Sequence, residues 1–293
     1  MLLAAVLFGT TGTAQALGPA ATTPLGVGAV RLLVGGVALV AVLPVLRRSP
    51  RGALALWRHP AGLAAAVCTA LYQVTFFAGV DRAGVALGTL LTIGSGPVFA
   101  GLLAWAVLGD RPARAWVVAT AVCVAGLALL SSDGLTAGSL SGLVLALASG
   151  LSYAAYTVAA KRLLDGGADP ADVMGAAFGL GGLLLVPVLA TQPLGWLAGP
   201  GGVVVALYLG LATTTVAYLL FGRGLAVLPA GPVTTLVLAE PLVATVFGVV
   251  LLDERLQPAG VVGAGLVLAG LVLQGVRSAR CPTEEAPAPS VPA

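Results

Sequence analysis

The chain has 293 residues, of which 59% are hydrophobic and only 9% are charged. Soluble domains carry about 25% charged residues, so this composition excludes a soluble globular protein and predicts an all-α integral membrane protein. The formal net charge is +3, and no basic, aromatic-rich soluble face is present, which excludes a nucleic-acid partner.

A membrane-spanning helix needs about 20 mostly apolar residues. The first apolar run lacks a basic n-region and is a poor signal peptide; we interpret it as a spanning helix, and its short beginning points to a start codon further upstream. The Pro/Ala-rich segment 277–293 is predicted to be a disordered cytoplasmic tail. Charge clusters and Gly/Pro turns divide the chain into ten predicted spans, at residues 2–19, 25–46, 61–79, 84–108, 114–131, 140–160, 171–190, 202–221, 228–252 and 258–276.

The placement of arginine and lysine predicts the orientation, because positive residues near helix ends stay on the cytoplasmic side. With the N-terminus inside, the outer loops hold only Arg82 and Arg255, and Arg31 lies within a span. The inner positions hold Arg47, Arg48, Arg51, Arg58, Arg111, Arg114, Lys161, Arg162, Arg223, Arg277 and Arg280. We therefore expect a multi-pass protein of the cell membrane with both termini in the cytoplasm.

A shift of 144 positions aligns two stretches of the chain. It lays "PVFAGLLAWAVLGDR" (97–111) on "PLVATVFGVVLLDER" (241–255), so that Pro97 meets Pro241 and an acidic–Arg pair closes both stretches. Leu, Val and Ala coincide often in membrane helices, whereas a proline and an acidic–Arg pair in one register rarely do. The alignment therefore indicates an internal repeat.

The repeat divides the chain into two halves, residues 2–131 and 140–276, with five predicted spans each. Because five is odd, equivalent helices would cross the membrane in opposite directions. Such inverted repeats are a recurring basis of alternating access in secondary transporters. We therefore predict ten transmembrane helices arranged as two inverted five-helix repeats.

The chain resembles the drug/metabolite transporter superfamily, specifically its ten-helix branch with two EamA-type repeats. The resemblance rests on "LFGTTGTAQALGP" near the start, on "GSGPVFAGLLAWAVLGDRP" and on "LAEPLVATVFGVVLLDERL", and it covers residues 2–276. The second repeat carries the Glu-Pro pair common in that family, whereas the first has Gly96 in place of the glutamate. The resemblance implies transport, with export as its direction.

Glu240 lies near the middle of the ninth predicted span, where a charge costs about 2.5–3.5 kcal/mol on insertion scales. It is therefore expected to face a water-filled cavity, a partner or a proton. The functional interpretation is proton coupling or substrate contact. The structural one is a carboxylate that bonds to backbone freed by Pro241. Pro97 and Pro241 each remove a helical hydrogen bond and are interpreted either as hinges or as packing kinks.

Arg31 is a second charged residue well inside a predicted span. It could bind an anionic substrate group, pair with Glu240, or extend to the outer headgroups while its stem stays in the apolar region. All three alternatives remain open on the sequence alone.

Polar and aromatic side chains recur at helical spacing on four spans, and such stripes are expected to face a bundle interior. We predict a central cavity between these spans; hydrogen bonds between helices are the alternative explanation. The candidate lining residues are Gln15, Tyr72, Gln73, Ser152, Tyr153, Tyr156, Thr215 and Tyr218.

The sequence contains no phosphate-binding loop, no Cys/His cluster with metal-ligand spacing, and a single histidine, His59, in a basic loop. We therefore expect no cofactor, no metal and no enzyme activity. The predicted function is a secondary transporter that exports small metabolites, amino acids or drug-like compounds, with protons as an optional coupling partner. The alternative is an intramembrane enzyme or a structural membrane scaffold.

Overall fold

Proline begins many of the helices in the computed structural model of the chain. Its missing N–H has no helical partner at the first position, and its fixed φ suits a helix start. The residue before the proline often caps the helix as well: the Thr23 side chain accepts from the Gly26 amide, and the Asp169 side chain accepts from the Ala171 amide. The helices that start with proline are those at Pro24, Pro50, Pro60, Pro170, Pro200 and Pro258.

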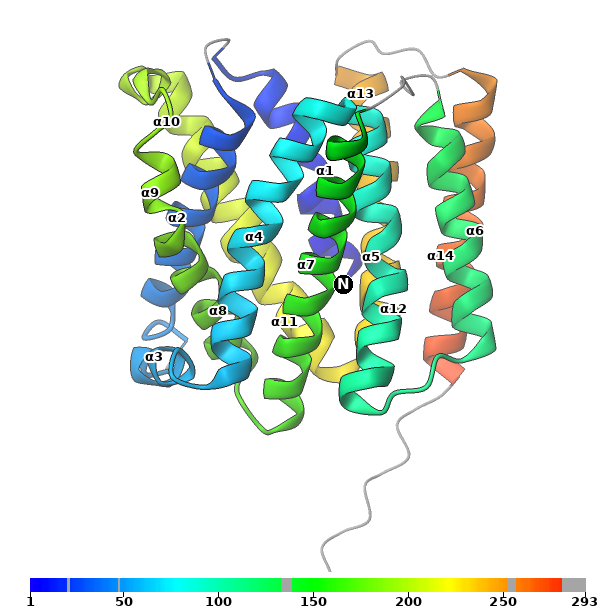
Figure 1. The fold of residues 1–293 in the computed structure, drawn as a ribbon, viewed down its shortest axis with the longest axis horizontal. Helices are drawn as coiled ribbons and strands as arrows, with labels where there is room; N and C mark the ends of the chain where they lie inside the picture. The colour runs from blue at the N-terminus through cyan, green and yellow to red at the C-terminus, as the bar shows by residue number, and fades with distance from the viewer. Residues whose placement is uncertain (20–21, 47, 133–138, 252–256, 281–293) are drawn as a thin grey trace, which may run out of the picture.

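The structure describes residues 1–19, 22–46, 48–132, 139–251 and 257–280. Residues 277–280 are described by their backbone only. Within these ranges the elements lie roughly side by side along one common direction (Figure 1). They are α1 (Leu2–Ala16), α2 (Pro24–Val42), α3 (Pro50–Leu56), α4 (Pro60–Ala83), α5 (Val85–Leu108), α6 (Arg114–Leu130), α7 (Leu140–Asp165), α8 (Pro170–Leu184), α9 (Val186–Leu189), the 3₁₀-helix η2 (Gly195–Ala198), α10 (Pro200–Leu207), the π-helix η3 (Tyr208–Val216), α11 (Ala217–Val227), α12 (Ala230–Val237), α13 (Ala239–Leu251) and α14 (Pro258–Arg280).

The all-α prediction is confirmed, since the described residues contain no strand. Seven helical segments are long and apolar enough to cross a membrane. In two of them, residues 200–227 and 230–251, shorter helices follow one another directly. Three further apolar helices, α1, α6 and α8, are shorter, with 15, 17 and 15 residues.

Close packing of the helices depends on glycine. The helices α6 and α14 pack along one edge of the bundle (Figure 1), where a Cβ on Gly126 would lie 2.7 Å from the amide nitrogen of Val267. The Cys123 thiol contacts the Val267 carbonyl at 3.6 Å in the same interface. Elsewhere α4 and α5 pack on α7, α2 packs on α8, and α1 packs on α13.

Two interruptions distinguish the C-terminal half. The segment from Tyr208 to Val216 is a π-helix, a rare form that is frequent at functional sites. The ninth predicted span breaks at Leu238, whose N–H donates to the Thr235 carbonyl at 3.0 Å. Pro241 follows the break by three residues and has no N–H for the carbonyl of Val237, so it contributes to the break. By contrast, α5 continues through Pro97.

Some elements differ from the predicted ones. The short helix α3 packs on α8 and was not among the predicted elements. The last helix extends to Arg280, beyond the predicted end at residue 276, because the next helix-breaking residue is Pro282. Arg47, the turn with Glu254 and Arg255, and the predicted disorder of residues 281–293 lie outside the described residues.

Candidate functional site

An aromatic cluster lies inside the bundle and joins both halves of the sequence. Its rings are in mutual contact, with centroid separations from 3.8 Å between Phe178 and Tyr218 to 6.5 Å between Tyr156 and Tyr218. Edge-to-face and tilted pairs of this kind stabilise a packed arrangement. The members are Phe8 of α1, Tyr72 and Phe76 of α4, Tyr153 and Tyr156 of α7, Phe178 of α8, and Tyr218 and Phe221 of α11.

A small central cavity lies within the cluster. Its volume is about 10 Å³, roughly the space that one water molecule requires. Four of its lining side chains are rings of the aromatic cluster, and the others are mostly polar. The lining residues are Arg31, Leu32, Thr69, Tyr72, Gln73, Tyr156, Phe178, Thr214 and Tyr218. The central cavity is therefore closed to any solute larger than water in this conformation.

Several buried polar atoms around the central cavity lack partners. Arg31 Nε, Thr69 Oγ1 and the Tyr153 hydroxyl have no hydrogen bond within the described residues. Buried polar groups in native proteins are nearly always paired, and each unpaired one costs about 1–3 kcal/mol. Such atoms mark a place where the polar groups of a ligand would bind favourably.

Arg31 points into the bundle. Its Nη2 donates to Gln73 Oε1 over a long 3.4 Å, and Gln73 Nε2 donates to the Gly28 carbonyl at 3.3 Å. Gln73 is only 1% exposed, so this contact holds the guanidinium at the central cavity. The geometry agrees with the two interior alternatives for Arg31 and not with extension to outer headgroups.

Glu240 lies in the first turn of α13, immediately after the break at Leu238. A Cβ on Gly9 would lie 2.8 Å from the Glu240 carbonyl oxygen, so α1 approaches α13 closely here. The carboxylate interacts electrostatically with Arg31 and lies within electrostatic range of the hydroxyls of Tyr72, Tyr153 and Tyr218. It forms no ion pair with any residue that the structure describes. A helix start also favours a negative charge, which offers a structural explanation for the same residue.

The structure brings seven of the predicted side chains together, around the central cavity or within electrostatic range of it. These are Arg31, Tyr72, Gln73, Tyr153, Tyr156, Tyr218 and Glu240.

Three others are placed differently. Ser152 donates to the Ala148 carbonyl at 2.8 Å, and Thr215 donates to the Gly35 and Gly210 carbonyls at 3.2 and 3.0 Å. Both hydroxyls therefore satisfy backbone groups. Gln15 is partly buried on α1 and does not line the central cavity.

Phe178 and Thr214 line the central cavity but were not predicted to do so. Phe178 lies in a glycine-rich stretch whose sequence indicates helix packing. Thr214 was missed because α-helical spacing selects Thr215. In the π-helix, Thr214 Oγ1 donates to the Leu209 carbonyl five residues earlier, at 2.9 Å, and the wider turn directs Thr214 to the cavity. The run of three threonines at 213–215 was the sequence feature that could have indicated Thr214 as a lining residue.

The profile of the EamA-like transporter family matches the chain twice, over residues 1–132 and 140–275. The chain belongs to the EamA-like transporter family. It is thus a multi-pass membrane transporter, and the family gives no indication of an enzyme.

Relatives of this EamA-family chain are bacterial. The uncharacterized transporter YwfM of Bacillus subtilis (strain 168) is 40% identical over 264 residues, which is 90% of this chain and 88% of the relative. A probable terminal-alkyne amino-acid exporter of Streptantibioticus cattleyicolor is 30% identical over 235 residues, 80% of this chain and 77% of the relative. A crystal structure of a protein with 19% identity has a TM-score of 0.79, covering 95% of this chain and 96% of the other. At that identity the likeness shows a shared fold only.

Proposed function

We propose that this EamA-family protein is a secondary transporter that exports small zwitterionic metabolites, amino acids first among them, across the cytoplasmic membrane. The observation that supports the proposal is a pair of groups of opposite charge, Arg31 at the central cavity and Glu240 within electrostatic range of Arg31, which form no ion pair with each other. Arg31 and Glu240 interact electrostatically, yet their charged atoms are farther apart than the 4.0 Å of an ion pair.

An amino acid carries one negative and one positive group, and each of them is opposite in charge to one of these two residues. Its carboxylate would accept hydrogen bonds from Arg31, whose planar guanidinium suits carboxylates. Its ammonium group would neutralise Glu240 and lie against tyrosine rings, which attract cations. Charges inside a membrane protein are costly unless they are paired, so a zwitterion would relieve both sites together.

Export as the direction rests on similarity. The Streptantibioticus cattleyicolor relative is described as an amino-acid exporter, and the sequence motifs resemble those of an exporter family. The site itself carries no information about direction, because a central site can serve flux either way.

Alternating access between two inverted five-helix repeats is proposed as the mechanism. The packing of the helices supports it: Gly9 packs against Glu240, and Gly96 packs against Tyr153, with a Cβ on Gly96 only 3.0 Å from the Tyr153 ring. The shift of 144 positions aligns residue 9 with residue 153 and residue 96 with residue 240. The contact between Gly9 and Glu240 is therefore equivalent to the contact between Gly96 and Tyr153. The same shift aligns Cys123 with Val267, and these two residues contact each other.

Ten spans with both termini in the cytoplasm complete the proposal. Each predicted span overlaps at least one helix of the described residues, and the family profile matches once per proposed half. The closed central cavity corresponds to a conformation between inward-open and outward-open states. Glu240 would carry a proton in a coupled exporter and would only contact substrate in a passive one.

Counterflow in proteoliposomes tests the zwitterion requirement. Vesicles loaded with phenylalanine, or with its decarboxylated amine or its deaminated acid, are diluted into radiolabelled phenylalanine. We expect accumulation of label with the amino acid inside and little with either singly charged analogue. Equal counterflow with the amine or the acid would overturn the zwitterion proposal, and no counterflow with any small zwitterion would overturn the transporter function proposed here.

A further inference from the structure

A fissure separates α5 from α6, although the two helices are consecutive. The main packing partner of α6 is α14, and that of α5 is α7. The fissure has a volume of about 590 Å³. Its walls are apolar and include Val98 and Leu102 of α5 and Val117, Ala121, Val124 and Ala125 of α6. Val98, Leu102 and Val117 are 46%, 51% and 49% exposed, so the fissure opens onto the outer surface of the bundle.

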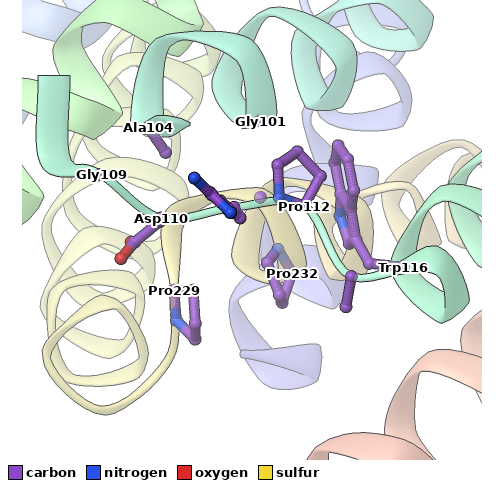
Figure 2. Close-up of a pocket in the computed structure, with 11 residues that line it drawn as sticks. Gly101, Ala104, Gly109, Asp110, Pro112, Trp116, Pro229 and Pro232 are labelled. Carbon is purple, nitrogen blue, oxygen red and sulfur yellow. The ribbon is translucent and has the colours of Figure 1, made fainter. Parts of the chain in front are cut away.

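One end of the fissure is cationic. Pro112 and Trp116 line both the fissure and a second pocket of about 330 Å³, which also includes Asp110 and Arg111. Figure 2 shows Pro112 and Trp116 on one side of this pocket and Asp110 on the other. Arg114 begins α6 beside them. Both arginines are exposed, and neither forms an ion pair with a residue in the described ranges.

Trp116 fixes the junction between the apolar and cationic parts. Its indole N–H donates to Thr235 Oγ1 at 3.0 Å, which ties α6 to α12. A Cβ on Gly231 would lie 3.1 Å from the indole, so the ring is held firmly. Tryptophan commonly lies at the level of lipid headgroups, where an apolar chain would end and a charged group would begin.

We propose that the fissure binds an anionic phospholipid, with one acyl chain between α5 and α6 and its phosphate at Arg111 and Arg114. In a bilayer, apolar walls alone do not choose among lipids, because lipid tails are as apolar as leucine. Charge makes the choice: two arginines outweigh the single carboxylate of Asp110 and favour a headgroup with net negative charge. The proposal needs the chain to span a membrane, as its family does, but it depends on neither the transported substrate nor the mechanism.

Lipid binding can be measured without any transport. The full chain in detergent, without substrate, is titrated with phosphatidylglycerol and with phosphatidylcholine that carry identical brominated acyl chains. Bromine quenches tryptophan fluorescence on contact. The quenching seen in the unmodified chain but not in Trp116→Phe is the contribution of Trp116, and it measures lipid bound in the fissure. We expect phosphatidylglycerol to reach half-maximal quenching of this component at a concentration about fivefold lower. Native mass spectrometry of the bound lipids gives a second measurement that does not need the tryptophan variant.

Two pairs of variants separate the cationic end from the apolar walls. Arg111→Gln with Arg114→Gln is expected to abolish the preference for phosphatidylglycerol, whereas Arg51→Gln with Arg58→Gln, which are exposed near α3, should retain it. Ala121→Phe with Ala125→Phe fills the fissure and should reduce bound lipid, whereas Val203→Phe with Val204→Phe on α10 should not.

Three results would overturn the proposal. One is equal quenching by both lipids in the unmodified chain, which indicates non-selective surrounding lipid only. Another is a preference that survives loss of both arginines. The third is a disulfide-linked dimer formed by Ala121→Cys at low lipid concentration, which indicates that a second copy of the chain covers the fissure.

Discussion

Arg31 lines the central cavity and Glu240 lies within electrostatic range of it, and the two residues perform different tasks in the proposed mechanism. Arg31 is held in place by Gln73, whereas Glu240 lies beside a helix break and lacks a fixed partner among the described residues. The fixed charge suits binding, and the less constrained carboxylate suits a change of protonation.

Replacement of Arg31 should weaken recognition of the substrate carboxylate. A hydrogen bond to a charged group contributes about 1.5–3 kcal/mol, so Arg31→Gln is expected to raise the Kd of an amino acid roughly 10- to 150-fold. Isothermal titration calorimetry on the purified protein measures this change. The corresponding decarboxylated amine should bind the variant and the unmodified protein equally weakly; a matching loss for the amine would mean that Arg31 acts through the fold.

Replacement of Glu240 tests coupling to protons. Glu240→Gln should insert into the membrane normally, abolish or uncouple flux, and remove the response of flux to a pH gradient, because the amide cannot take up or release a proton. Flux is measured in proteoliposomes with and without an imposed gradient. Asp81→Asn, at an exposed carboxylate, serves as the matched control. Unchanged flux and pH response in Glu240→Gln would remove this residue from the mechanism.

At the scale of the helices, the α2–α8 pair shows how strongly glycine determines packing. A Cβ on Gly36 would collide with the carbonyl oxygen of Phe178, a backbone atom that cannot move without its helix. Phe178 lines the central cavity. The approach of α2 to α8 therefore determines both the stability of the bundle and the position of one cavity wall.

Gly36→Ala should therefore lower the thermal stability of the protein. Extra methyl groups in a tightly packed core cost about 1–3 kcal/mol, and the apparent melting temperature in detergent should fall. Gly12→Ala is the matched control, because a Cβ at Gly12 meets nothing within 4 Å and alanine favours helix over glycine. If both variants melt together, the close contact between α2 and α8 is not a determinant of stability.

How far the sequence predicts the structure varies between elements. Apolar runs located the helices well, because a span needs a minimum apolar length whatever its neighbours are. Tyr72, Gln73, Tyr156 and Tyr218 were identified by helical spacing, since a polar stripe has one favourable direction. Thr214 was not identified in this way, because the π-helix turns the chain by a different number of residues than an α-helix. The formation of a π-helix depends on packing across the bundle, which the local sequence does not show.

At the scale of the whole molecule, the proposed inverted repeat predicts on which side of the membrane each connecting segment lies. The turn after α5 and the segment before α14 occupy equivalent places in the two halves, so they should lie on opposite sides of the membrane. Both Asp110 and Gln257 are exposed, and each provides a site for labelling.

A membrane-impermeant maleimide measures this topology. In a chain whose native cysteines are replaced by alanine, Asp110→Cys should react only from the cytoplasmic side and Gln257→Cys only from outside. Oriented vesicles, labelled before and after permeabilisation, separate the two cases. Labelling of both positions from one side would disprove the inverted arrangement, and with it the proposed alternating access between inverted repeats.

The contact between Gly96 and Tyr153 limits how this chain can change over evolution. A Cβ at position 96 would lie 3.0 Å from the Tyr153 ring, closer than an ordinary van der Waals contact, so a side chain there needs the ring to shift. A second carboxylate at position 96, matching the one at position 240, would therefore require the ring of Tyr153 to move aside. While the ring keeps this place, only the second repeat holds a carboxylate at this position, and a single carboxylate can carry at most one proton in each cycle.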